Sequence, residues 1–253
     1  MPVPRTYLTR GLVLKNTPFG EADLLVSLYS REFGKIRALA KGTRKPTSRM
    51  VGHLEPLTIL DLSLFKGRNL DTINQAQIVN NLGSLKSDLS QISEGLYVCE
   101  LIDGFGNESN SNIELYQVAI ETLENIDRDH QQHLNLRWFE IHLLRTTGFK
   151  IELETCTQCN RDIEPQQHRF SPDSGGVLCL HCNITAHRIY PLSLQALKVL
   201  RFLERNPLNN LPHLNISNTL EKELKLLLGN TVRYWIDKEI RSNAFIEHLE
   251  HLK

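Results

Sequence analysis

Hydrophobic and polar residues alternate along the first eighty residues of the chain. A period of two is typical of β-strands with one buried face. Leu24, Val26 and Leu28 fall on one face of such a segment, and Ile36, Ala38 and Ala40 fall on the inner face of the next. Turn residues separate the segments. The pattern therefore predicts five strands, at residues 7–16, 23–30, 35–41, 57–66 and 70–79.

These five short strands are joined by tight turns except between the third and the fourth, where a longer irregular link intervenes. That arrangement favours a small closed barrel, and the five-stranded OB-fold is the leading candidate.

From about residue 82 the hydrophobic period becomes helical. In the last such segment Leu220, Leu224, Leu227 and Trp235 recur at helical spacing. Residues 206–218, which hold two prolines and six asparagines or serines, are predicted to be a loop. The predicted helices lie at residues 89–105, 113–126, 134–147, 192–203 and 220–235.

Two Cys-x-x-Cys pairs lie nineteen residues apart and account for four of the five cysteines: Cys156 with Cys159, and Cys179 with Cys182. This spacing is typical of a site that holds one structural Zn²⁺ through four thiolates. Such a site has no open position for water or substrate. Disulfides, a redox dithiol and unligated thiols are the alternatives, and the sequence lacks the strand–helix context of a redox motif.

Other potential ligands near the four cysteines are interpreted as bystanders, namely His168, His181 and His187. Cys99 lies in an apolar helical run and is interpreted as a small buried hydrophobe.

The cysteine-rich section interrupts a helical region and is too short to have its own core, so the metal is expected to hold a β-hairpin together. The fold class predicted is therefore α+β and multidomain: an OB-fold barrel, then an α-helical domain interrupted by a zinc-ribbon-like four-cysteine insertion. The expected divisions are residues 1–80 for the barrel, 81–150 and 191–253 for the two helical parts, and 151–190 for the insertion.

The net charge of zero hides an asymmetry. Residues 1–50 hold ten lysines and arginines against three acids, and the rest of the chain has a compensating excess of acids. A basic end indicates a polyanionic partner. No apolar run reaches the roughly 18 residues of a membrane span, and no signal peptide is apparent. Together with metal-type cysteines, these features favour a cytoplasmic protein without a membrane partner.

Basic residues are concentrated on the third predicted strand and in the link that follows it. Lys35, Arg37 and Lys41 share the outer face of that strand with Leu39. Residues 41–49 contain four cations and no acid, and such a loop at a barrel edge can follow a phosphate backbone. A plain linker is the alternative. The candidate DNA-binding residues are Lys35, Arg37, Lys41, Arg44, Lys45 and Arg49, with Arg10 and Lys15 as outer candidates.

Several short motifs, in this order, resemble those of the bacterial recombination-repair protein family RecO. Gly20-Glu21-Ala22-Asp23, Phe33-Gly34-Lys35 and residues 40–45 resemble its N-terminal barrel. Residues 97–101 and 136–144, with Gly148-Phe149, resemble its helical domain, and the cysteine pairs lie where many members carry a zinc ribbon. Each motif is weak alone, but their order covers nearly the whole chain.

The resemblance implies a recombination mediator rather than an enzyme. Members bind single- and double-stranded DNA, anneal complementary strands, and act with RecR to load the RecA recombinase on DNA coated by SSB. By the same resemblance, Arg137 matches an arginine that recognises the acidic C-terminal tail of SSB. Alternatively, Arg137 caps a helix or pairs with Glu140 or Glu154. The implied location is the cytoplasm, at the nucleoid.

Two other classes of function compete with this interpretation. One is a zinc-stapled adaptor that binds RNA or an acidic protein without annealing activity. The other is a metalloenzyme, which needs an open coordination position that four thiolates do not leave. No Walker-type or dinucleotide-binding glycine pattern appears in the sequence. The resemblance implies that the protein has no small-molecule substrate.

Overall fold

A computed structural model describes residues 5–45, 48, 50–108, 110–128, 134–182 and 186–236. The described chain forms two compact units, the first ending at residue 128 and the second beginning at residue 134. The division into four segments expected from the sequence stays a prediction.

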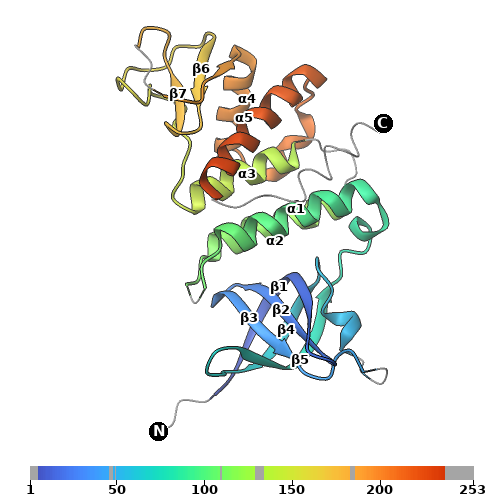
Figure 1. Cartoon of the computed structure of the whole chain (residues 1–253). Coiled ribbons are helices and arrows are strands. Elements are labelled where there is room, and N and C mark those ends of the chain that lie inside the picture. Colours follow the sequence, from blue (N-terminus) through green and yellow to red (C-terminus); the bar gives the residue numbers. More distant parts are fainter. Residues whose placement is uncertain are drawn as a thin grey trace. The chain divides into compact units, whose positions relative to one another are not determined.

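The first unit contains a closed barrel (Figure 1). Its strands follow the order β1-β2-β3-β5-β4, which is the order of an OB-fold. β3 runs parallel to β5, and the other neighbours are antiparallel. The predicted barrel is thereby confirmed. Its strands are β1 (Thr6–Phe19), β2 (Asp23–Ser30), β3 (Gly34–Ala40), β4 (Ile59–Phe65) and β5 (Asp71–Asn80).

Alternating side chains of the strands fill the barrel interior. Val26 and Leu28 of β2 are completely buried, as is Ala38 of β3, whereas Arg37 between the inward residues of β3 is exposed. The predicted inner faces are confirmed. The predicted end of the first strand at residue 16 is wrong, because β1 continues to Phe19 and pairs there with Asp23. The reversal is confined to a tight turn in which Gly20 has a φ of 60°, a value that favours glycine.

Two helices complete the described part of the first unit: α1 (Leu89–Phe105) and α2 (Ile113–Arg128). The Asp88 carboxylate begins α1 by accepting a hydrogen bond from the Gln91 N–H at 3.0 Å. α1 packs on β1 and β2. Cys99 on this helix is buried, and its Sγ faces the Val13 carbonyl at 3.9 Å, as expected for a small hydrophobe. Short 3₁₀ turns occur at Val51–His53 and Leu85–Ser87.

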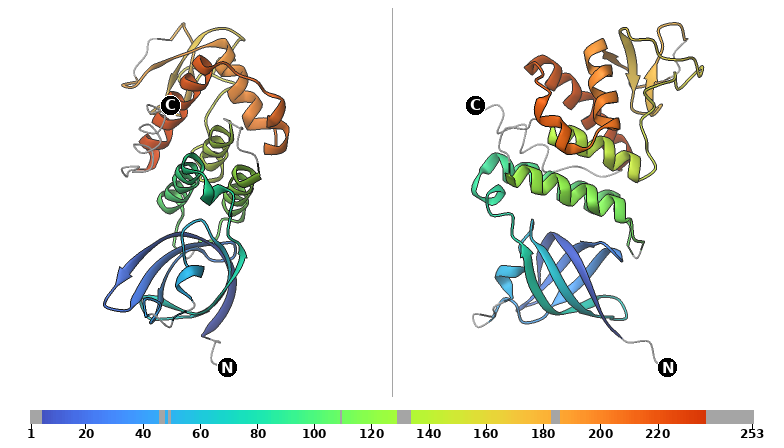
Figure 2. Two further views of the ribbon diagram at one scale, coloured as in Figure 1. Left: turned by 90° about the vertical axis from the view of Figure 1, so that its right-hand side faces the viewer. Right: turned by 180° about the vertical axis from the view of Figure 1, so that it is seen from behind.

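The described part of the second unit contains three α-helices and a small sheet, which lies beside α4 (Figure 2). The sheet has the order β7-β6-β8, and its β6–β7 hairpin occupies the predicted cysteine-rich insertion. The predicted loop at 206–218 instead contains a 3₁₀ helix, Leu208–His213. The remaining elements are α3 (Asn135–Thr146), α4 (Leu194–Arg205), α5 (Asn218–Ile236), β6 (His168–Ser171), β7 (Gly176–Leu178) and β8 (Tyr190–Leu192).

The predicted fold class is confirmed: a barrel precedes a helical part that carries a four-cysteine cluster and a small sheet. A search of the described helices finds none that combines the length and the hydropathy of a membrane span.

Candidate metal centre and nucleic-acid interface

The four predicted cysteine ligands converge on one point in the second unit. Their sulfur atoms all lie within 4.8 Å of one another. Cys156 Sγ is 3.7 Å from Cys182 Sγ, Cys159 Sγ is 3.7 Å from Cys179 Sγ, and Cys179 Sγ is 3.4 Å from Cys182 Sγ. Tetrahedral zinc with bonds of about 2.3 Å separates its sulfurs by about 3.8 Å. The residues present therefore fit a four-coordinate metal ion, and all five cysteines are free thiols.

Backbone hydrogen bonds shape the loops that carry these thiols. The Cys156 N–H donates to the Arg161 carbonyl at 2.8 Å, and the Asn160 N–H donates back to the Cys156 carbonyl at 2.9 Å. The Thr157 N–H donates to Val177 of β7 at 2.9 Å. These bonds place the first cysteine pair against the hairpin that leads into the second pair.

The thiols differ in acidity because their surroundings differ. Burial opposes ionisation of Cys156, but N–H groups, first that of Cys179 at 3.3 Å from the sulfur, lower the pKa of Cys156 to about 6. Hydrogen bonding to the neighbouring sulfurs, first that of Cys159, raises the pKa of Cys182. Four thiolates this close repel one another unless a cation sits among them, so the donor set suits a divalent metal.

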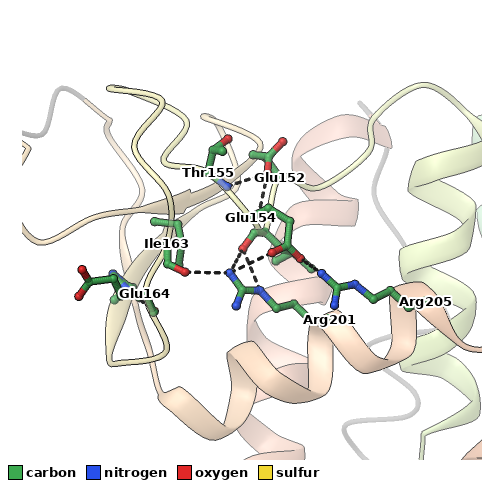
Figure 3. A network of polar contacts seen from close by, with 9 residues as sticks. Glu152, Glu154, Thr155, Ile163, Glu164, Arg201 and Arg205 are labelled. Atoms are coloured by element: carbon green, nitrogen blue, oxygen red, sulfur yellow. Dashed lines mark hydrogen bonds and ion pairs between the residues drawn. The ribbon is translucent and has the colours of Figure 1, made fainter.

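A polar network from α4 supports the segment that enters the cysteine cluster (Figure 3). The Arg201 guanidinium donates to the Leu153 carbonyl at 2.7 and 3.2 Å and to the Ile163 carbonyl at 3.1 Å. Glu154 pairs with Arg201 at 3.3 Å and also with Arg205. Arg201 thus holds both ends of the segment that carries Cys156 and Cys159.

The nearby histidines do not join the cluster. Among the described residues, the group that is able to hold a metal consists of the four cysteines alone. His168 is buried and its Nε2 contacts the Glu164 carbonyl at 2.8 Å.

Four of the predicted DNA-binding cations lie exposed at β3 and just after it. Arg37 is on the outer face of β3, and Lys41, Arg44 and Lys45 follow the strand. Among the described residues, no ion pair involves any of these four side chains.

The first part of the loop after β3 is fixed to the β1–β2 turn. The Gly42 N–H donates to the Asp23 carboxylate at 2.7 Å, and the Arg44 N–H donates to the Ala22 carbonyl at 2.9 Å. Thr43 is buried. The exposed side chains of Lys41, Arg44 and Lys45 therefore extend from a backbone segment that hydrogen bonds hold in place. Arg49, the last predicted cation of the loop, lies outside the described residues.

The other predicted cations of the barrel are in ion pairs. Arg10 pairs with Asp61 at 2.8 and 2.9 Å. Lys15 and Lys35 both pair with Asp103 of α1, at 2.6 and 2.9 Å. Neither acid was singled out from the sequence, because a pairing across 51, 68 or 88 positions leaves no local signal.

Arg137, the predicted contact for an acidic tail, is buried on α3. One Nη donates to the fully buried Glu140 carboxylate at 2.8 Å. The other, Nη1, has no hydrogen-bond partner among the described residues. The guanidinium therefore forms an ion pair within α3, and its Nη1 is a donor that no described residue uses.

Aromatic side chains near the cations are few. Phe19 and Phe33 are partly exposed, Tyr29 is buried, and the rings of Tyr7 and Phe33 pack with centroids 4.7 Å apart. The surface around these cations thus offers more groups that contact phosphates than rings that stack on bases.

Comparisons with known proteins cover both units. A family model described as "Recombination protein O N terminal" matches residues 4–82, and one described as "Recombination protein O C terminal" matches residues 86–244. A curated "DNA repair protein RecO" from Dehalococcoides mccartyi is 34% identical over 249 residues, which is 98% of either chain. Proteins of the same name from Roseiflexus sp. and Desulforamulus reducens are 33% and 31% identical, covering 98% and 97% of this chain and 87% and 95% of theirs.

Proposed function

The chain belongs to the RecO family of DNA repair proteins, a family of non-enzymatic recombination mediators, and we propose that it binds single- and double-stranded DNA and anneals complementary strands. The single observation that carries this proposal is the group of exposed cations at β3, which have no ion pair among the described residues. We place the main DNA contacts at Arg37, Lys41, Arg44 and Lys45.

Annealing requires no bond-making residue, because base pairing itself drives the reaction. The barrier is the repulsion between two phosphate backbones. Cations on a fixed surface lower that repulsion and release counterions on binding. The hydrogen bonds from Gly42 and Arg44 to the β1–β2 turn fix the backbone that carries Lys41, Arg44 and Lys45.

The proposed partners follow the family. In this proposal the protein acts with RecR in the bacterial cytoplasm, at the nucleoid, to load RecA on SSB-coated DNA. Arg137 is proposed to recognise the acidic SSB tail. Nη1 of Arg137 has no hydrogen-bond partner among the described residues, and a carboxylate is the acceptor that such a donor prefers. Because Nη1 is buried, binding of the tail requires this part of α3 to become accessible. The buried pairing with Glu140 is the competing role.

The four cysteines are proposed to hold one structural Zn²⁺. When bound, the ion supplies cross-linking and charge compensation rather than reaction chemistry, because four thiolates leave no open position. The Cys179 N–H stabilises the Cys156 thiolate, and Arg201 fixes the loop around it. Metal content of the purified protein tests this assignment. Protein that is folded and free of metal contradicts it.

The salt dependence of DNA affinity tests the DNA proposal. With a single-stranded oligonucleotide, each phosphate contact contributes about 0.7 to the slope of log affinity against log salt. The variant K41Q/R44Q/K45Q should therefore lower the magnitude of the slope by about 2. The matched control is K198Q/K222Q, which removes exposed cations of α4 and α5. An unchanged slope in the triple variant contradicts the assignment of the surface.

The annealing of complementary oligonucleotides separates this function from the alternative of an adaptor that binds RNA or an acidic protein. Wild-type protein should accelerate annealing, and the triple variant should lose most of the acceleration. Binding of RNA without any acceleration of DNA annealing would favour the adaptor.

A further inference from the structure

Asp103, near the C-terminal end of α1, forms ion pairs with two lysines of the barrel. Its carboxylate lies 2.6 Å from Lys15 Nζ and 2.9 Å from Lys35 Nζ. The exposed fractions of the side chains are 14% for Asp103, 12% for Lys35 and 57% for Lys15. The two lysines come from β1 and β3, so one acid of the helix contacts two separate strands.

The position of Asp103 in α1 explains why nearby cations stabilise its carboxylate. Asp103 lies in the last turn of α1, where the helix dipole disfavours a negative charge and the last carbonyls have no partner within the helix. Lys35 Nζ also donates to the backbone carbonyl of Asp103. Lys35 therefore acts as a cap for the C-terminal end of α1.

The backbone around Lys35 is covered as well. The Lys35 N–H donates to the Asn107 carbonyl at 3.0 Å, and both Gly34 and Lys35 form bridges with Glu108. Gly34 has a φ of 66°, and a Cβ on it would lie 2.2 Å from the Asn110 carbonyl oxygen. The chain that follows α1 thus packs directly against the start of β3 and covers its backbone.

Arg37 marks where this cover ends. It lies two residues after Lys35, on the same outer face of β3, and its side chain is exposed. By strand register, Lys15 is opposite Ser27 and Ser27 is opposite Arg37. Lys15, Ser27 and Arg37 therefore lie in one row across the sheet. Lys15 pairs with Asp103, whereas Arg37 has no ion pair among the described residues.

We propose that Asp103 sets the boundary of the DNA-binding surface, so that DNA contacts Arg37 and the cations after it but not Lys15 or Lys35. This inference rests on the proposed function. The Lys35 side chain is largely buried where it caps α1. Lys15 is accessible, but a phosphate on its ammonium would lie close to the Asp103 carboxylate, and the two anions would repel each other.

Single charge deletions test the boundary on the intact protein. The salt slope of binding to a fluorescent oligothymidylate is measured for wild type, K15Q, K35Q, R37Q and K41Q. R37Q and K41Q should each lower its magnitude by about 0.7, and K15Q and K35Q should leave it unchanged. Lys15 is exposed, so K15Q is the variant least at risk of unfolding. A slope lowered by K15Q or K35Q as much as by R37Q overturns the proposal.

Asp103→Asn tests the same boundary from the other side. D103N frees Lys15, so the magnitude of the slope should rise by about 0.7, with tighter binding at low salt. The rise should disappear in K15Q/D103N. A folded D103N protein with the wild-type slope overturns the role of Asp103. If D103N does not fold, the slopes of K15Q and K35Q decide the question.

Failure of the proposed function gives a different result. In that case the wild-type protein itself shows no salt-dependent binding. The ion pair between Lys35 and Asp103 is then tested by a double-mutant cycle, in which the unfolding free energies of K35Q, D103N and the double variant are measured. The effects of the two substitutions should be clearly non-additive. Additive effects would show that Lys35 and the Asp103 carboxylate do not stabilise each other.

Discussion

Glu140 and Arg137 form an ion pair inside α3, with the Glu140 carboxylate completely buried. Removing one partner of a buried pair leaves the remaining charge poorly compensated. Arg137→Met should therefore lower the free energy of unfolding by about 3 kcal/mol, measured by urea denaturation. The double variant R137M/E140L should recover much of that loss. A stable R137M protein would show that the pair is not important to the helix.

This pairing affects how the tail-site proposal is tested. A variant of Arg137 that loses the SSB tail has also lost a buried ion pair. Tail affinity therefore has to be compared at equal folded fractions, or the two roles of the residue are confused.

Asp103 also predicts a dependence of stability on pH. Burial by itself raises the pKa of Asp103, but the hydrogen bonds from Lys15 and Lys35 lower it below the usual 3.8. A carboxyl whose pKa is lowered by folding stabilises the protein above its unfolded pKa and loses that contribution as the pH falls through the folded value. D103N should be less stable than wild type at pH 7, and the difference should shrink below about pH 4. Unfolding free energies measured across this range check the prediction, and a constant difference contradicts it.

At the scale of elements, the boundaries of β2 and α1 could be predicted from the sequence, because alternation and helical periodicity run there without interruption. The end of β1 could not, since Pro18 suggested a turn but lies opposite Leu24 in the ladder. The four cysteine ligands could also be predicted, because the spacing within each Cys-x-x-Cys pair is a local pattern of the sequence. The pairings of Asp103 and Arg201 depend on tertiary structure and have no sequence period.

Arg201 and Arg205 on α4 make a matched pair for measuring support of the cysteine cluster. Arg201 is partly buried and donates to two backbone carbonyls, whereas the Arg205 side chain is 62% exposed. Arg201→Ala should lower the free energy of unfolding by about 1–3 kcal/mol and speed metal loss to a chelator. Arg205→Gln should change the unfolding free energy by less than about 1 kcal/mol. Equal effects of the two variants would contradict a specific role for Arg201.

At the scale of the whole molecule, the four-cysteine cluster and the exposed cations of β3 belong to different compact units. The cysteines lie in the second unit and the exposed cations of β3 in the first. Chelation should therefore lower the melting temperature of the second unit while the salt slope of DNA binding stays near its wild-type value. Amide exchange resolved by segment, together with oligonucleotide titration, measures both. Loss of DNA binding on chelation would show that the units depend on each other.

The barrel ring is closed by a short seam. β3 and β5 are in register only at Ala38 with Asp71 and Leu39 with Thr72. Local opening has a low free energy where few hydrogen bonds must break. Breathing of the ring is therefore expected to begin between these two strands. A polynucleotide held by Arg37 and Lys41 at either end of that seam would damp the breathing, and slowed amide exchange in β5 would then report an occupied surface on β3.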